Sequence, residues 1–102
     1  MIGCGSIVMH DALVNAGARI GRNCILNTKS LIEHDSTVGD HCHIATRATI
    51  NGDVSLGDHV FVGSNSVVFQ GCHVGEHSVV GGGQIVRSSL GAGFHPNGAK
   101  VI

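Results

Sequence analysis

The chain has 102 residues, a formal net charge of −1 at pH 7 and 13% charged residues. This length allows a single domain, and the weak charge excludes a strongly basic protein built to bind nucleic acid or an anionic membrane. No apolar run is long enough to span a bilayer, and the first residues lack the charged and apolar regions of a signal peptide. We therefore expect a cytoplasmic protein with reduced cysteines and no nucleic-acid or membrane partner.

Hydrophobic residues make up 42% of the chain, yet it contains no Trp, no Tyr and only three Phe. A core of Val, Ile, Leu and small residues, without large aromatic side chains, is built from thin layers that repeat. Sixteen Gly beside a single Pro indicate many tight corners and not disorder. This composition is typical of a protein made of short internal repeats.

In chain order, a large aliphatic residue recurs at every sixth position without a gap. These residues are Ile2, Val8, Val14, Ile20, Leu26, Ile32, Val38, Ile44, Ile50, Leu56, Val62, Val68, Val74, Val80 and Val86. Four residues after them runs a second column, small except for two Val: Ser6, Ala12, Ala18, Cys24, Ser30, Ser36, Cys42, Ala48, Val54, Val60, Ser66, Cys72 and Ser78. The residue directly after each aliphatic is often Gly or Asn, which tolerate a left-handed backbone, so we expect the left-handed turn residues there.

A strict period of six fits neither an α-helix nor an ordinary strand. It predicts eighteen-residue coils, each with three short strands joined by three corners, stacked at the inter-strand spacing of about 4.8 Å. Residues 1–86 are expected to form about five coils of a parallel β-helix, which is an all-β fold. Residues 87–102 lose the repeat and are expected to form an irregular C-terminal cap or tail.

Outward side chains eighteen residues apart share a face of such a coil stack. The first face carries Ile7, Ile25, His43, Phe61 and Val79; the second carries Leu13, Leu31, Thr49, Val67 and Ile85; the third carries Arg19, Thr37, Ser55 and His73. Two faces are thus apolar and one is polar. Because soluble monomers seldom expose two such stripes, we predict a homotrimer in which one apolar face packs on the neighbour's other apolar face. The alternative is a monomer with scattered surface aliphatics.

His34 is the histidine best placed for chemistry. It lies at the corner between the second apolar face and the polar face, with small neighbours, Ala16 and Gly52, one coil before and after it. A large polar ring between two small residues is expected to lie in an accessible depression of the protein surface. Asp35 can accept a hydrogen bond from the ring or favour its protonated form. In a trimer, His34 and a neighbour's His43 are expected to share one cleft; the alternative is a solvated turn histidine.

The other histidines and the cysteines suggest structure more than chemistry. His41, His59 and His77 are eighteen apart and form a ladder on one corner, where we favour a solvated turn over a metal site and expect no bound metal. Cys24 and Cys42 stack in adjacent coils with a spacing that permits a disulfide, but both stand in the small inward column. We interpret them, with Cys72, as core residues, so no cysteine is placed for a covalent intermediate.

Several segments of the chain resemble one branch of the hexapeptide-repeat acyltransferases, which contains the sialic acid O-acetyltransferases and the bacterial UDP-amino-sugar N-acetyltransferases. The segments are Ile25-Leu26-Asn27-Thr28, Glu33-His34-Asp35 and Gly39-Asp40-His41-Cys42-His43-Ile44. The resemblance implies that the coils wind left-handed, that the protein is a trimer and that acetyl-CoA is the co-substrate.

The resemblance also implies roles for individual residues. In this branch the histidine before an acidic residue is the general base, which corresponds to His34 with Asp35 behind it. The histidine nine residues later, His43, would contact acetyl-CoA, and the amide of Gly52 would bind the thioester oxygen. Two further positions match the cofactor groove: Ser64 and Gly82.

The chain also departs from this branch. The coils begin without the usual N-terminal nucleotide-sugar domain, a Pro-Gly corner reads Gln70-Gly71, and the closing Gly-x-Pro-Ala-Lys appears only within His95–Lys100. The sequence therefore does not name the acceptor or the site of the CoA nucleotide.

The leading hypothesis is an acetyltransferase that moves the acetyl group of acetyl-CoA directly to an amine or hydroxyl of a small, possibly sugar-like acceptor. The alternatives are a non-catalytic trimeric scaffold and, with less support, a zinc carbonic anhydrase-type enzyme. The latter uses a pair of histidines five residues apart, a spacing that this chain lacks.

Overall fold

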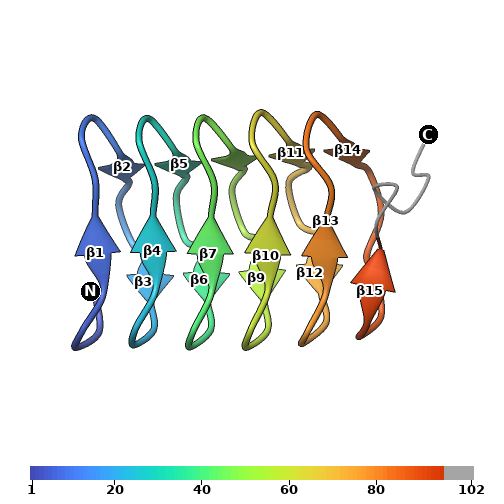
Figure 1. Ribbon diagram of the computed structural model, residues 1–102, viewed down its shortest axis with the longest axis horizontal. Helices are drawn as coiled ribbons and strands as arrows, with labels where there is room; N and C mark the ends of the chain where they lie inside the picture. Colours follow the sequence, from blue (N-terminus) through green and yellow to red (C-terminus); the bar gives the residue numbers. More distant parts are fainter. Residues whose placement is uncertain (96–102) are drawn as a thin grey trace.

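The computed structural model describes residues 1–95, which form a left-handed parallel β-helix of two-residue strands (Figure 1). The strands fall into three sheets that run along the helix. The first sheet contains β1 (Ile7–Val8), β4 (Ile25–Leu26), β7 (His43–Ile44), β10 (Phe61–Val62), β13 (Val79–Val80) and β15 (Phe94–His95). The second contains β2 (Leu13–Val14), β5 (Leu31–Ile32), β8 (Thr49–Ile50), β11 (Val67–Val68) and β14 (Ile85–Val86). The third contains β3 (Arg19–Ile20), β6 (Thr37–Val38), β9 (Ser55–Leu56) and β12 (His73–Val74).

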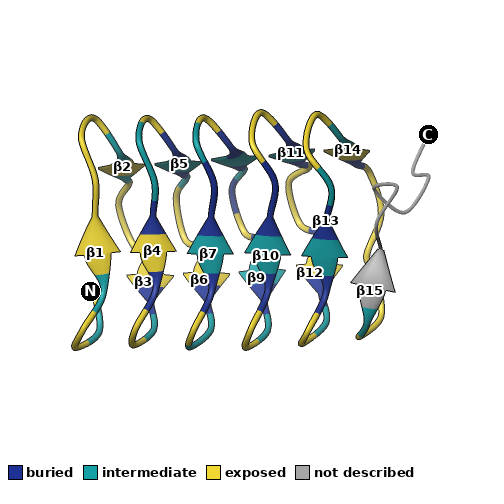
Figure 2. Ribbon diagram, in the orientation of Figure 1, coloured by how far each residue is buried: buried dark blue, intermediate teal, exposed yellow. Residues whose placement is uncertain are grey.

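Each strand places one side chain outward and the next one inward, as the six-residue period predicts. In β7, for example, His43 is half-buried on the surface while Ile44 is fully buried. Strands β1 to β11 each pair in parallel with the strand eighteen residues further on, so that Ile44 lies between Leu26 and Val62, whereas β13 pairs with β15, in which Phe94 is the partner of Val79. Figure 2 shows the burial increasing from the exposed first coil into the middle of the stack. The predicted core is therefore confirmed from Ala18 onward, whereas Ile2 and Val8 at the start of the inward column are exposed.

The left-handed backbone, however, lies at a different turn position from the one expected. Positive φ angles occur three residues after the inward aliphatic, at Asp35 (59°), His41 (58°) and Asp53 (56°) among others. The glycines directly after the aliphatics serve close approach instead. A Cβ on Gly39 would lie 2.7 Å from the carbonyl carbon of Gly57 in the next coil. The expectation failed because stacking of backbones, and not φ, selects glycine at that position.

The small inward residues tie neighbouring coils together. The hydroxyl of Ser36 donates to the carbonyl of Asn51 at 2.6 Å and accepts from the amide of Val54 at 3.0 Å. Thiols make the same kind of link, because Cys24 Sγ donates to the Gly39 carbonyl at 3.0 Å. All four cysteines are free, and burial raises the pKa of the Cys42 thiol to about 12.

The stacking of coils continues beyond Val86, the expected end of the repeats. Leu90 is buried and forms a parallel bridge with Val74, and β15 pairs with β13. The segment expected to be an irregular cap thus contributes a strand to the first sheet, while its residues 96–102 lie outside the described part. Within residues 1–95 there is no helix of the length and apolarity needed to cross a membrane.

The two apolar faces predicted from the sequence lie on the surface of the single chain. Exposed outward residues include Ile7 (53%) and Ile25 (37%) on the first sheet and Leu13 (50%) and Ile85 (42%) on the second.

Candidate functional site

The corner that carries His34 joins β5 to β6 and is anchored at both ends. Ile32 before it and Ser36 after it are fully buried. The amide of Asp35 donates to the carbonyl of Ala16 at 3.0 Å, and the amide of Asp53 donates to the carbonyl of His34 at 3.0 Å. The corner is therefore hydrogen-bonded to the coils before and after it, which fixes the backbone from which His34 projects.

The imidazole ring of His34 lies over Gly52, in the space left by the missing side chain. A Cβ on Gly52 would overlap His34 Nε2 and lie 2.5 Å from Cε1. The ring is half-exposed, and its Nδ1 lies 3.2 Å from Asp35 Oδ2. The structure thus places His34, Asp35 and Gly52 together. With Asp35 as the acceptor at Nδ1, the Nε2 atom is the nitrogen available to a substrate.

The backbone amide of Gly52 belongs to the residue on which the imidazole of His34 lies. Gly52 is buried, and its carbonyl accepts a hydrogen bond from the amide of Gly71 at 3.0 Å. Its own N–H has no hydrogen-bond partner within residues 1–95. A backbone donor without a protein acceptor, next to an imidazole, is a candidate site for an oxyanion.

An open groove runs from His34 along the helix, with a volume of about 510 Å³. It is lined by pairs of residues from three successive coils: Glu33 and His34, Asn51 and Gly52, and Phe69 and Gln70. Phe69 is 37% exposed, and the guanidinium of Arg87 lies 5.1 Å from the centre of its ring. Sequence reasoning missed the contribution of Asn51, Phe69 and Gln70, although the eighteen-residue spacing from Glu33 and His34 could have indicated them.

A second carboxylate lies near the ring. Ligand atoms of His34, Asp35 and Asp53 are all within 4.8 Å of one another, and all three residues are exposed. Among residues 1–95 this is the one group of three side chains close enough to share a metal ion. Sequence reasoning also missed Asp53, which stands eighteen residues after Asp35.

The predicted cofactor residues lie elsewhere on the chain. His43 projects from the first sheet, where its ring contacts Phe61 edge-on at 5.2 Å and its Nε2 lies 3.4 Å from Asn27 Nδ2. Ser64 and Gly82 follow β10 and β13 at the corner between the first and second sheets, and the amide of Gly83 donates to the Ser64 carbonyl at 2.8 Å. One chain therefore brings Ser64 and Gly82 together, but keeps both at a different corner from His34.

The ladder of His41, His59 and His77 is a stack of exposed rings. The ring centroids are 4.9 Å and 4.8 Å apart. Neighbouring carboxylates are engaged by backbone, because Asp40 accepts from the amide of Arg22 and Asp58 accepts from the amide of Asp40, both at 2.8 Å. The hydrogen bond from the Arg22 amide is the main reason that the pKa of Asp40 is lowered. These contacts agree with a solvated turn.

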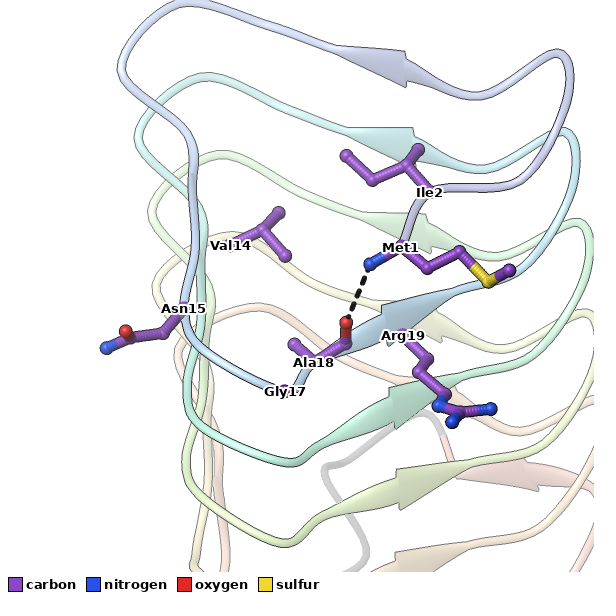
Figure 3. Close-up of a pocket in the computed structure, with 7 residues that line it drawn as sticks. All are labelled: Met1, Ile2, Val14, Asn15, Gly17, Ala18 and Arg19. Carbon is purple, nitrogen blue, oxygen red and sulfur yellow. Dashed lines mark hydrogen bonds between the residues drawn. The ribbon is translucent and has the colours of Figure 1, made fainter.

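A further pocket of about 550 Å³ opens at the first coil (Figure 3). Its lining includes Met1, Ile2 and Val14, and the Met1 ammonium donates to the carbonyl of Ala18 at 3.2 Å. This pocket is the apolar end of the core and lacks an imidazole, carboxylate or thiol, so we do not assign chemistry to it.

Comparisons with protein families agree with the repeat. The model of the bacterial transferase hexapeptide (six repeats) matches residues 17–52 and 35–70, which together span more than half of the chain. The hexapeptide repeat of succinyl-transferase matches residues 53–88. No curated protein sequence matches the chain.

Solved structures of acetyltransferases have the same coils. The acetyltransferase domain of PglB from Neisseria gonorrhoeae is 29% identical, with a TM-score of 0.85, over 96% of this chain and 45% of that one. The same domain in complex with acetyl coenzyme A is 28% identical, with a TM-score of 0.84, over 88% and 44%. PerB from Caulobacter crescentus, in complex with CoA and GDP-perosamine, is 24% identical with a TM-score of 0.81, over 93% and 55%, a likeness of fold alone. The chain spans about half the length of these structures.

Proposed function

Because the chain belongs to the bacterial transferase hexapeptide family, we propose that it transfers the acetyl group of acetyl-CoA to an amine or hydroxyl of a small, sugar-like acceptor. The observation that carries this proposal is the imidazole of His34, hydrogen-bonded to Asp35 and lying over Gly52, whose amide has no protein acceptor within residues 1–95. A base next to an oxyanion donor is the arrangement that acyl transfer requires.

In the proposed reaction the acceptor nitrogen or oxygen attacks the carbonyl carbon of the thioester, and His34 Nε2 takes the proton of the acceptor. The carbonyl oxygen becomes an oxyanion, to which the Gly52 amide donates a hydrogen bond. When the tetrahedral intermediate collapses, the carbon–sulfur bond breaks and the proton on His34 passes to the departing CoA thiolate. The products are the acetylated acceptor and CoA, and His34 is neutral again.

Direct transfer is favoured over an acyl-cysteine intermediate. Cys24, Cys42 and Cys72 are buried in the core. Burial raises the pKa values of Cys42 and Cys72, so these thiols stay protonated at neutral pH. A protonated, buried thiol is neither nucleophilic nor accessible to a thioester.

We propose that the active form is a homotrimer with acetyl-CoA between subunits. The core of each coil is filled by aliphatic side chains, so a cofactor has room only on the surface. Packing the first apolar face on a neighbour's second apolar face would cover the exposed aliphatics and bring the neighbour's His43 towards His34. Ser64 and Gly82 would then hold a further part of the cofactor. The PglB acetyltransferase domain, which was solved in complex with acetyl coenzyme A, supports this co-substrate.

The proposal is tested by calorimetric titration with CoA and acetyl-CoA, followed by a screen of amines, amino sugars and sugars in which acetylated product is detected by mass spectrometry. We expect acetyl-CoA binding and at least one acetylated product that His34→Ala abolishes. A protein that binds neither CoA nor acetyl-CoA would instead support the non-catalytic scaffold. Zinc analysis of the purified protein addresses the carbonic anhydrase-type alternative.

A further inference from the structure

The ring of His34 has carboxylates from two coils beside it. Asp35 and Asp53 are eighteen residues apart and occupy the same left-handed turn position, with φ angles of 59° and 56°. The repeat therefore stacks the second aspartate on the first. One ligand atom of each lies within 4.8 Å of the other and of a ring nitrogen of His34.

The backbone of Asp53 is fixed relative to His34. Its amide donates to the carbonyl of His34 at 3.0 Å, and its side chain leaves the chain directly after Gly52, the residue on which the ring lies. Asp53 thus approaches the ring from the coil that also supplies the proposed oxyanion donor. Asp35 approaches it from the coil of His34 itself.

We propose that Asp53 is a second positioning residue for His34, acting together with Asp35; this inference rests on the acetyl transfer proposed above. The hydrogen bond from His34 Nδ1 to Asp35 is 3.2 Å long, and the two side chains are 51% and 63% exposed. A single exposed pair of this kind holds a side chain weakly, because water screens it and both groups remain mobile. A second carboxylate from the next coil keeps the ring over Gly52 when the first contact opens.

The two carboxylates also stabilise the positive charge that forms on His34 during the reaction. Proton transfer from the acceptor turns His34 into an imidazolium while the carbonyl oxygen of the thioester becomes an oxyanion. Two carboxylates within a few ångströms of the ring stabilise this cation, and either one does so in part if the other is removed. The roles of Asp35 and Asp53 therefore overlap, and their substitutions are expected to be non-additive.

The test compares Asp35→Asn, Asp53→Asn and the double variant with Asp11→Asn. Asp11 is a matched control, because it is an exposed aspartate at the same turn position (φ 58°) and pairs with Lys29 on another corner. Asparagine tolerates the left-handed backbone at least as well as aspartate, so folding should be kept. The readouts are kcat and KM with the acceptor found by screening, and the ¹⁵N signals of the His34 ring, assigned with His34→Gln.

We expect each single substitution to lower kcat by less than about 5-fold and the double substitution by about 10²-fold, the lower end of what a general base contributes, with KM little changed. Asp53→Asn should also shift the ring signals of His34, whereas Asp11→Asn should not. Equal kcat values and equal ring signals for Asp35→Asn and the double variant would overturn the role of Asp53. Should His34→Ala keep full turnover, the proposed function itself would fail, while the ring signals would still report whether Asp53 acts on His34.

Discussion

The imidazole of His34 lies on Gly52, one coil further along the helix, so closely that a Cβ on Gly52 would overlap the ring. The surface depression that holds the ring of the proposed base therefore exists because Gly52 has no side chain. Since the φ angle of Gly52 is not positive, an alanine can adopt its backbone conformation.

Gly52→Ala should displace the ring of His34 without unfolding the coils. The ring is the end of a movable side chain, so it can swing into solvent and lose its position beside the oxyanion donor. We expect kcat to fall by about 10- to 10²-fold, less than the loss of the base itself, and the melting temperature to change little. Steady-state kinetics and thermal unfolding by circular dichroism check this. Gly91→Ala is the matched control, because a Cβ there meets no atom of residues 1–95 within 4 Å. Unchanged kcat in Gly52→Ala would mean that the ring position does not matter.

Removal of the base itself should have the largest effect on turnover. His34→Ala is expected to lower kcat by about 10²–10⁴-fold, the usual contribution of a general base. The side chain is half-exposed and buries little, so the fold and the oligomeric state should be kept. Asp35→Ala should cost less, because Asp35 positions the base and does not take the proton. Steady-state kinetics of the wild type, His34→Ala and Asp35→Ala measure these effects, and light scattering checks that each protein keeps its oligomeric state. Wild-type turnover in His34→Ala would contradict this mechanism.

The trimer and the cofactor site should be lost together. Phe61 projects from β10 on the first apolar face, where its ring meets His43. Phe61→Asp places a charge in the proposed interface, so we expect a folded monomer that no longer binds CoA. Sedimentation and calorimetry measure both properties. Thr37→Asp, on the exposed polar face of the third sheet, is the control that should remain trimeric. A monomeric Phe61→Asp with normal CoA affinity would place the cofactor within one subunit.

The thiols should differ sharply in reactivity. Cys4 is exposed, whereas Cys24, Cys42 and Cys72 are buried. With a disulfide reagent at pH 8, one thiol of the native protein should react quickly and all four should react in denaturant. Fast reaction of two or more thiols in the native protein would contradict the closed core.

Burial of Cys42 also predicts a loss of stability in alkali. The pKa of its thiol is raised from the ordinary value of 9.0 to about 12 in the folded chain, so the unfolded chain ionises first as the pH rises. This contribution to the free energy of unfolding is complete below about pH 9 and is lost between about pH 9 and 12. Urea unfolding across this range measures it. Cys42→Ala, which puts into the inward column a residue type already found there, should show a shallower decline.

The sequence by itself determined the coil. An aliphatic residue every six positions predicts coils of three short strands that bury this column, because neither a helix nor a flat strand has that period. The left-handed winding of the coils came from the family resemblance and not from the period. The eighteen-residue spacing also predicted that His34 lies beside Gly52, since residues eighteen apart stack when each coil pairs with the next. Asp35 is the next residue in the sequence. The wrong expectation concerned the turns, where glycine composition does not distinguish positive φ from close backbone approach, as Gly39 shows.

Only the tertiary structure determined the direction in which side chains extend between neighbouring coils. His34 leans towards Gly52, and Asp53 comes within reach of the ring, because side-chain rotamers depend on the packing of three coils at once. The groove formed with Phe69 and Gln70 has the same origin. The strand at β15 appears without the six-residue signal because backbone pairing with β13 requires hydrogen-bonding groups and not a particular side chain. Periodicity therefore specifies which residues stack, and packing specifies which of their atoms meet.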